Sequence, residues 1–144
     1  MIMSRTLEFK ESAHLDPALT DPATRTLNAD KLIGRWRNTN PKTQGIAEIV
    51  IKEHDGKFSV SASGVGLDGP IPWRPVQVQV LANLEEEAGQ RAVALAVNFD
   101  FDFMTAETYL RVNKGVLVIV LFNTFRDDSG RSNYVNREFF YRQD

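Results

Sequence analysis

At 144 residues the chain has the length of one domain, and a chain of this size buries about two-thirds of the surface that its unfolded form exposes. Its formal net charge of -2, with 42% hydrophobic and 25% charged residues, gives no excess of basic groups, which excludes the electrostatic footprint of a nucleic-acid or membrane-surface protein. Cysteine is absent, which excludes disulfides, thiolate nucleophiles and cysteine-ligated zinc.

Residues 1–27 differ from the rest of the sequence. Their apolar positions are scattered, and Pro17 and Pro22 oppose a long regular element. We expect an N-terminal arm that lies along the domain or across a partner. The first ten residues lack the apolar core of a secretory signal, and no later window has the length of a membrane span. A cytoplasmic protein is therefore expected.

Residues 28–144 are expected to form one β-barrel domain. Asn28 or Asp30 can cap a short helical turn that leads into the first strand. The stretches of β-type sequence that follow are cut by turn residues and predict eight strands, at about 33–39, 45–53, 57–63, 73–82, 91–101, 104–112, 116–125 and 132–142. Many evenly spaced strands without helices among them indicate an all-β fold, an eight-stranded antiparallel up-and-down barrel.

Turn residues mark the hairpins. Asp55-Gly56 predicts a two-residue turn with positive φ, and Asn113-Lys114-Gly115 predicts a three-residue loop with the glycine in the left-handed region. Residues 127–130 close the last hairpin. Between the third and fourth strands, residues 63–72 are rich in Gly and Pro and predict an irregular loop. Loops at the mouth of a barrel are where binding sites usually lie.

Two strands differ in how their faces are composed. In 57–62, apolar and polar residues alternate, so one face meets water. In 116–122 both faces are apolar, which the outer surface of a small solitary barrel does not explain. Either the N-terminal arm or another copy of the chain is expected to cover this strand. We predict a homo-oligomer, most simply a dimer, through strand 116–122 or through the arm.

The triplet Gly34-Arg35-Trp36 resembles the Gly-X-Trp opening of the calycin barrels, which include lipocalins and avidins. The resemblance implies that Gly34 permits close chain approach at the barrel base and that Trp36 closes the base from inside. It also implies an arginine of the last strand over the indole, here Arg137 or Arg142. These four residues are assigned to the structure of the barrel.

Trp36-Arg37-Asn38 is similar to the Trp-Thr-Asn start of the avidins, whose Asn and a loop Ser or Thr hydrogen-bond the ureido oxygen of biotin. By that resemblance Asn38 points inward and Thr43 is the nearest loop hydroxyl. Avidins line their pocket with several tryptophans, whereas this chain has only Trp36 and Trp73. Biotin itself is not expected, and a different small ligand is left open.

The acidic residues, histidines and serines do not form a clear pattern of a metal or catalytic site. Asn98, Asp100 and Asp102 share one face of a strand, which suits either a solvated outer surface or, if the acids point inward, a cation or acid–base site. His14 and His54 are the only histidines and have no second His at short spacing, so a metal site is not predicted. No serine lies in a strand–turn–helix elbow.

Three classes of function follow from the barrel. The first is non-catalytic binding of a small, partly apolar molecule at the open end, without a cofactor, by Asn38, Thr43, Trp73, Tyr109, Asn123 and Tyr134. The alternative is a protein-interaction module with a filled barrel, inhibitor-like or for assembly. An enzyme would need an inward acid pair such as Asp100 with Glu107. The prediction is therefore a binding protein rather than an enzyme.

Overall fold

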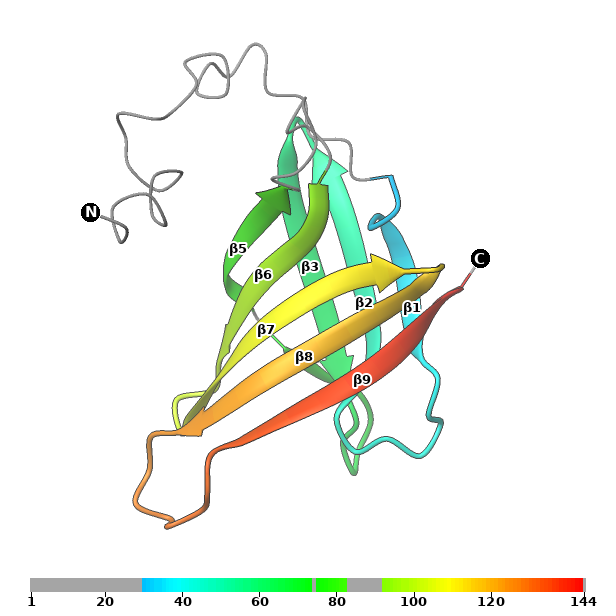
Figure 1. The fold of residues 1–144 in the computed structure, drawn as a ribbon. Coiled ribbons are helices and arrows are strands. Elements are labelled where there is room, and N and C mark those ends of the chain that lie inside the picture. The colour runs from blue at the N-terminus through cyan, green and yellow to red at the C-terminus, as the bar shows by residue number, and fades with distance from the viewer. Residues whose placement is uncertain (1–29, 74, 83–91, 144) are drawn as a thin grey trace, which may run out of the picture.

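The computed structural model describes residues 30–73, 75–82 and 92–143, and in these residues the chain forms one antiparallel sheet (Figure 1). The described residues contain no helix, and none that could cross a membrane. Its strands are β1 (Gly34–Asn38), β2 (Ile46–His54), β3 (Lys57–Gly64), β4 (Ile71–Trp73), β5 (Pro75–Ala82), β6 (Ala92–Asp100), β7 (Met104–Asn113), β8 (Val116–Phe125) and β9 (Tyr134–Gln143).

The strand order is β4-β3-β2-β1-β9-β8-β7-β6-β5, and the sheet curls into a half-barrel (Figure 1). The first and last strands, β1 and β9, pair in the middle of the sheet, with Trp36 opposite Arg142. β4 and β5 are the two ends of the order, yet they are separated in the chain by residue 74 alone. β3 and β5 also lie close together. The all-β, antiparallel, up-and-down arrangement is thus confirmed.

The expected count of eight strands is not what the structure contains. The stretch 73–82, expected as one strand, is divided between β4, which pairs with β3, and β5, which pairs with β6. Pro72 and Pro75 flank the division, and a proline cannot donate a ladder hydrogen bond. The chain therefore changes its pairing partner at this point.

The start of the domain also differs from expectation. Residues 30–32 form a turn rather than a helix before β1. Residues 28 and 29 and the expected arm 1–27 lie outside the described residues.

The two tight hairpins have the same geometry. Asp55 and Gly56 have φ of 50° and 78°, as the sequence predicted. Lys114 and Gly115 have φ of 53° and 81°, and Asn113 pairs directly with Val116. The second connection is therefore a two-residue turn, not the three-residue loop that was expected. Positive φ at both central residues gives the turn the twist that matches the flanking strands.

Strand alternation places one apolar face inside the curl. On β8, Leu117, Ile119 and Leu121 are all buried, and they pack in one cluster with residues of the other strands. The largest members of the core are Trp36, Phe99 and Phe140. On β3 the alternation of apolar and polar residues indicated this face, and Val60 and Ala62 are buried. On β8 both faces are apolar, so the pairing register, not the sequence, identifies the inner one.

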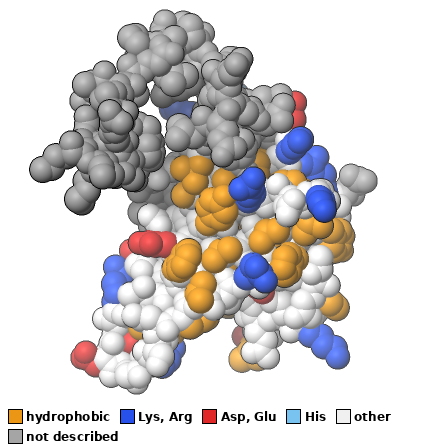
Figure 2. All heavy atoms as spheres, in the orientation of Figure 1, with side chains coloured by type: hydrophobic (Ala, Val, Ile, Leu, Met, Phe, Trp, Pro, Cys, Tyr) orange, Lys and Arg blue, Asp and Glu red, His pale blue; other side chains and the backbone are white. Residues whose placement is uncertain are grey.

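The outer face of β8 and β9 is also apolar, and it meets water in the single chain. Phe122 is 52% exposed, Val135 61%, Phe139 41% and Tyr141 46%. Figure 2 views this face and shows apolar side chains interspersed with Lys and Arg over β7, β8 and β9.

The two rims of the curled sheet are different. The loop end carries the connections 39–45, 65–70, 101–103 and 126–133, and the hairpin end carries turns 55–56 and 114–115 together with residues 30–33. The connection 83–91 also belongs to the hairpin end, because Ala82 pairs with Ala92 there, and its residues lie outside those described.

Candidate functional site at the loop end

Three polar side chains meet inside the curl at the loop end. Asn38 is the last residue of β1, Thr43 lies in the loop that follows, and Glu138 comes from β9. Glu138 Oε1 accepts hydrogen bonds from Asn38 Nδ2 at 3.1 Å and from Thr43 Oγ1 at 2.8 Å. Asn38 and Thr43 are 7% and 9% exposed. We call these three residues the Glu138 cluster.

The backbone holds the cluster in place. Asn38 Nδ2 also donates to Ile46 O at 2.9 Å, and its Oδ1 accepts from Asn40 N at 2.8 Å. Thr43 Oγ1 accepts from Gly45 N at 3.1 Å. Asn38 points inward because it follows the buried Trp36 by two residues on the same strand. These hydrogen bonds fix the orientation of the Asn38 and Thr43 side chains.

The second carboxylate oxygen of Glu138 is buried and has no hydrogen-bond partner among residues 30–73, 75–82 and 92–143. An unsatisfied buried acceptor costs about 1–3 kcal/mol, and more when the group is charged. In the described part of the chain, no Lys or Arg forms an ion pair with Glu138. The cluster can therefore still accept a hydrogen bond from a donor that the described residues do not supply.

Two amide side chains lie next to the cluster on the inner side of β8 and β9. We call the Glu138 cluster and these two amides the polar row. Asn123 of β8 donates from Nδ2 to Asn136 Oδ1 of β9 at 2.8 Å. Asn136 lies two residues from Glu138 on the same face, with Leu121 and Ile119 as their partners across the ladder. Asn123 is 3% exposed. The polar row thus runs along the inner side of β9 toward its beginning.

Aromatic rings line the loop end next to the polar row. Trp73 lies edge-on to Phe101 at 4.8 Å between centroids, Phe101 lies 6.3 Å from Phe103, and Phe103 stacks with Phe125 at 6.5 Å. Tyr134 follows at 6.1 Å from Phe125. We call these five residues the aromatic row. It gives the loop end an apolar wall.

One arginine covers part of this wall. The guanidinium of Arg131 lies 4.2 Å from the ring centroid of Phe125 and 5.4 Å from that of Phe103. It also donates to Asp127 Oδ2 at 2.8 Å and to Ser129 Oγ at 2.9 Å, within its own loop. Cation–π contact of this kind orders the loop 126–133 against the rings.

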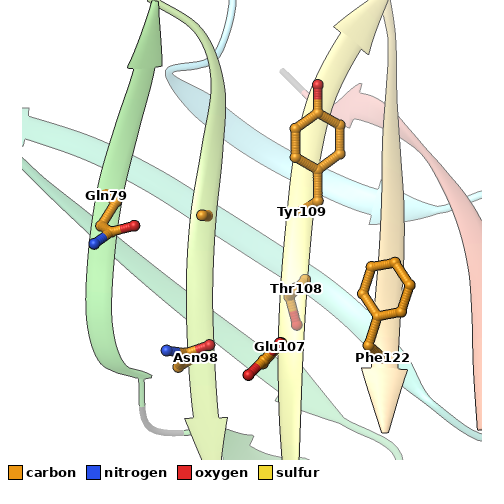
Figure 3. A pocket seen from close by; sticks show the side chains of 7 residues that line it. Gln79, Asn98, Glu107, Thr108, Tyr109 and Phe122 are labelled. Carbon is orange, nitrogen blue, oxygen red and sulfur yellow. The ribbon is translucent and has the colours of Figure 1, made fainter. Parts of the chain in front are cut away.

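Tyr109 does not join the site at the loop end. The inward residues of β7 are Met104, Ala106, Thr108 and Leu110, so Tyr109 belongs to the outer face. There it lines a shallow hollow of about 300 Å³ with Gln79, Ala96, Asn98, Glu107 and Phe122 (Figure 3). Five of the six residues expected to bind ligand are thus at the loop end, and one is outside.

The residues assigned to the barrel base lie at the hairpin end. The Arg142 guanidinium lies 4.7 Å from the Trp36 ring centroid and donates to Lys31 O at 2.6 Å, while Trp36 Nε1 donates to Leu32 O at 2.9 Å. Gly34 has φ of 146°, and a Cβ there would meet the Arg142 side chain at 3.4 Å. Arg137 is on the outer face, over Phe139 at 5.5 Å.

The acidic row proposed as a cation or acid–base site points away from the core. Asn98, Asp100 and Asp102 are all exposed, while Phe99 is buried beneath them. Asp100 accepts from Asp102 N at 2.9 Å and pairs with Arg126. The backbone hydrogen bond and, secondarily, Arg126 lower the pKa of Asp100 below its usual value. Glu107, its expected partner in an enzyme, is exposed on the outer face.

The two histidines were the other residues considered for a metal site. His54 is exposed beside Asp55, and His14 lies outside the described part of the chain. No group of three or more His, Asp or Glu able to hold a metal is found among residues 30–73, 75–82 and 92–143.

Glu138 is the residue that reading the sequence missed. The alternation of β9 could have indicated that Glu138 points inward. Phe140 is fully buried, and Asn136 and Glu138 are on the same face as Phe140. A glutamate amid exposed charged residues gives no sign by itself of being inside.

In the comparisons with known proteins, no family model, no curated protein and no solved structure matches this chain.

Proposed function

We propose that this protein binds a small, partly apolar molecule at the loop end without transforming it. The Glu138 cluster would hold the polar part of the ligand, and the aromatic row would contact the apolar part. Orientation by a few fixed polar groups beside an apolar wall is the usual composition of such sites.

The observation that carries this proposal is the unpartnered Oε2 of Glu138. Its neighbour Oε1 already accepts two hydrogen bonds, and both donors are themselves fixed by the backbone. A ligand with an N–H or O–H donor would satisfy the remaining oxygen and recover the cost of its burial. Binding rather than catalysis is proposed because the cluster contains one carboxylate, without the second acid that paired acid–base chemistry uses.

A calycin-like closed barrel is the fold that we propose for this site. The chain continuity of β4 and β5, at the two ends of the sheet order, supports closure. The contact of Arg142 with Trp36 at the hairpin end supports the resemblance. In such a barrel the loop end would be the open mouth.

The test is a thermal-shift screen with paired aromatic amides. Each primary amide is compared with its N,N-dimethyl analogue, which keeps the ring and the carbonyl but has no N–H. We expect some primary amides to raise the melting temperature and their dimethyl analogues to fail. Equal shifts within the pairs, or no shift with any compound, would overturn the proposal.

Substitution at the cluster sharpens this test. Glu138→Gln keeps an oxygen for Asn38 and Thr43 but can present a donor where Oε2 now accepts. We expect it to abolish the shift while the unliganded protein stays folded. Glu53→Gln, at an exposed position near the hairpin end, is the matched control and should keep the shift.

A protein-interaction module is the second candidate. The buried cluster of apolar side chains fills the inner face of the curl, whereas the outer face of β8 and β9 exposes large apolar residues. An exposed apolar strip on a sheet favours contact with another protein surface. The expected homo-oligomer through 116–122 is retained as a proposal on this ground.

A further inference from the structure

The outer face of β7, β8 and β9 combines an apolar centre with ordered charges. Val116, Val118, Val120 and Phe122 form the centre line on β8, all pointing outward. β9 adds Phe139 opposite Val118 and Val135 opposite Phe122, and β7 adds Tyr109 opposite Val120. We call this surface the β8 face; it is the one turned toward the viewer in Figure 2.

Two opposite charges lie symmetrically about Tyr109. Glu107 precedes it by two residues and Arg111 follows it by two, so all three share the outer side of β7. Both charged residues are exposed, and neither forms an ion pair within the described part of the chain. Glu107 stands opposite Phe122 and Arg111 opposite Val118 on β8. The charges therefore bracket the apolar centre line.

We propose that the β8 face binds a second copy of this chain in a two-fold symmetric dimer, with Glu107 of each copy paired to Arg111 of the other. Consider a two-fold axis that lies between the stacked faces and runs across the strands through Tyr109 and Val120. This rotation reverses the strand direction and keeps the order of the strands. Glu107 then meets Arg111 of the second copy twice, and Phe122 meets Val118. Glu107 and Arg111 are thus complementary between the two copies. Arg137, opposite Val120 on β9, lies at the axis and comes near Arg137 of the second copy, and each guanidinium leans away from the axis over its own Phe139, at 5.5 Å from the ring centroid.

The hollow beside the β8 face fits this pairing. It holds about 300 Å³ and is lined by Gln79, Asn98, Glu107, Tyr109 and Phe122 among others (Figure 3). The carboxylate of Glu107 and the amide oxygens of Gln79 and Asn98 are acceptors, and Asn98 stands directly opposite Glu107 in the ladder. A guanidinium offers five N–H donors in a plane, which suits such a group of oxygens. Under the same rotation, Arg111 of the second copy comes over this hollow.

This inference rests on the second function proposed above, assembly through the outer face, and does not need the ligand site. Its test is sedimentation equilibrium of the full chain, from about 1 to 100 μM. The variants are Glu107→Arg, Arg111→Glu and the double exchange, with Glu53→Arg as control. We expect a dimer for the wild type and control. Each single exchange, which sets like charges opposite each other, should raise the dimer Kd at least about tenfold. The double exchange should return it to within about threefold of the wild type.

Two results would overturn the inference in distinguishable ways. A wild-type chain that stays monomeric at 100 μM removes both assembly and the charge pairing. A dimer whose Kd is unchanged by both single exchanges, or is not restored by the double exchange, removes the pairing of Glu107 with Arg111 and leaves assembly by another surface. Circular dichroism of each variant checks that the sheet is retained.

Discussion

At the scale of single residues, the most consequential side chains are those whose polar atoms are fixed inside the sheet. Asn38 and Thr43 each donate a hydrogen bond to one oxygen of Glu138, and the other oxygen has no partner among the described residues. At the opposite rim, Arg142 covers Trp36 and caps the carbonyl of Lys31. At Glu138 one carboxylate oxygen still lacks a donor among the described residues, whereas Arg142 makes both a ring contact and a hydrogen bond. We therefore propose that the loop end binds a ligand and that the hairpin end stabilises the fold.

Replacing Arg142 by alanine is expected to destabilise the fold. The variant loses a cation–π contact and a hydrogen bond to a carbonyl, together about 1–3 kcal/mol of unfolding free energy. Urea unfolding measures the loss. Arg35→Ala is the control, because Arg35 is exposed on the neighbouring strand and forms only a long surface ion pair with Glu48, at 3.8 Å. Equal losses in the two variants would contradict the role given to Arg142.

Replacing Gly64 by alanine is expected to displace Trp73. A Cβ at Gly64 would clash with Trp73 Nε1, and the indole also packs edge-on against Phe99 and Phe101. Overpacking of this kind costs about 1–3 kcal/mol. Tryptophan fluorescence should shift, because the other tryptophan, Trp36, is fully buried on β1, three strands away, and makes a constant contribution. Ser61→Ala, on the same strand and exposed, should leave the spectrum unchanged; an unchanged spectrum for Gly64→Ala would refute the placement of the indole.

At the scale of elements, the hairpins and short turns decide the register of the sheet. Lys114 occupies a left-handed position in a two-residue turn, where asparagine or glycine is favoured. Asp102 is likewise left-handed, in the connection from β6 to β7, and its N–H donates to Asp100. Local strain at Lys114 is therefore offset by the pairing of β7 with β8.

Relieving that strain should stabilise the protein. Lys114→Asn keeps the turn and removes the cost of a long side chain at positive φ, so we expect a gain of about 0.5–1 kcal/mol in chemical unfolding. Asp55→Asn at the other hairpin is the control and should be near neutral, because both residue types tolerate that conformation. A loss of stability in Lys114→Asn would show that the side chain makes a contact that the turn geometry does not reveal.

The connection 101–103 should show a pH signature. The pKa of Asp100 is lowered first by the hydrogen bond from Asp102 N and then by Arg126. Its contribution to stability is therefore present above the unfolded pKa and is lost as the pH falls through the lower folded value. NMR titration of the Asp100 carboxyl should give a pKa below 3.8, which rises in Arg126→Gln but does not return fully to normal. Full return would make Arg126, not the backbone, the main cause.

At the scale of the whole molecule, much of the fold was predictable because period-two alternation and turn residues act locally. β7 and β8 were found within a residue of their true ends, and the turn at Asp55-Gly56 was identified. The division of 71–82 was missed because it depends on which neighbour each half pairs with, a long-range property. Asn38 and Thr43 could be named from the residues around Trp36. Glu138 could not, because its inward direction is set by the register of β9 against β8.

Two surfaces emerge at this scale, and they are independent. The Glu138 cluster lies on the inner side of β9, whereas the β8 face lies on the outside (Figure 2). A dimer formed through the β8 face would leave the inner side of β9 uncovered, because side chains of successive residues point to opposite faces. Loss of assembly and loss of ligand binding should therefore be separable by mutation.

The central claim, that Glu138 holds a small molecule at the loop end, is tested most directly by native mass spectrometry of freshly purified wild type and Glu138→Gln. We predict that the wild type carries an additional small mass, released on denaturation, and that the variant does not. A bare wild type, or an adduct of the same mass and occupancy on both proteins, would contradict it.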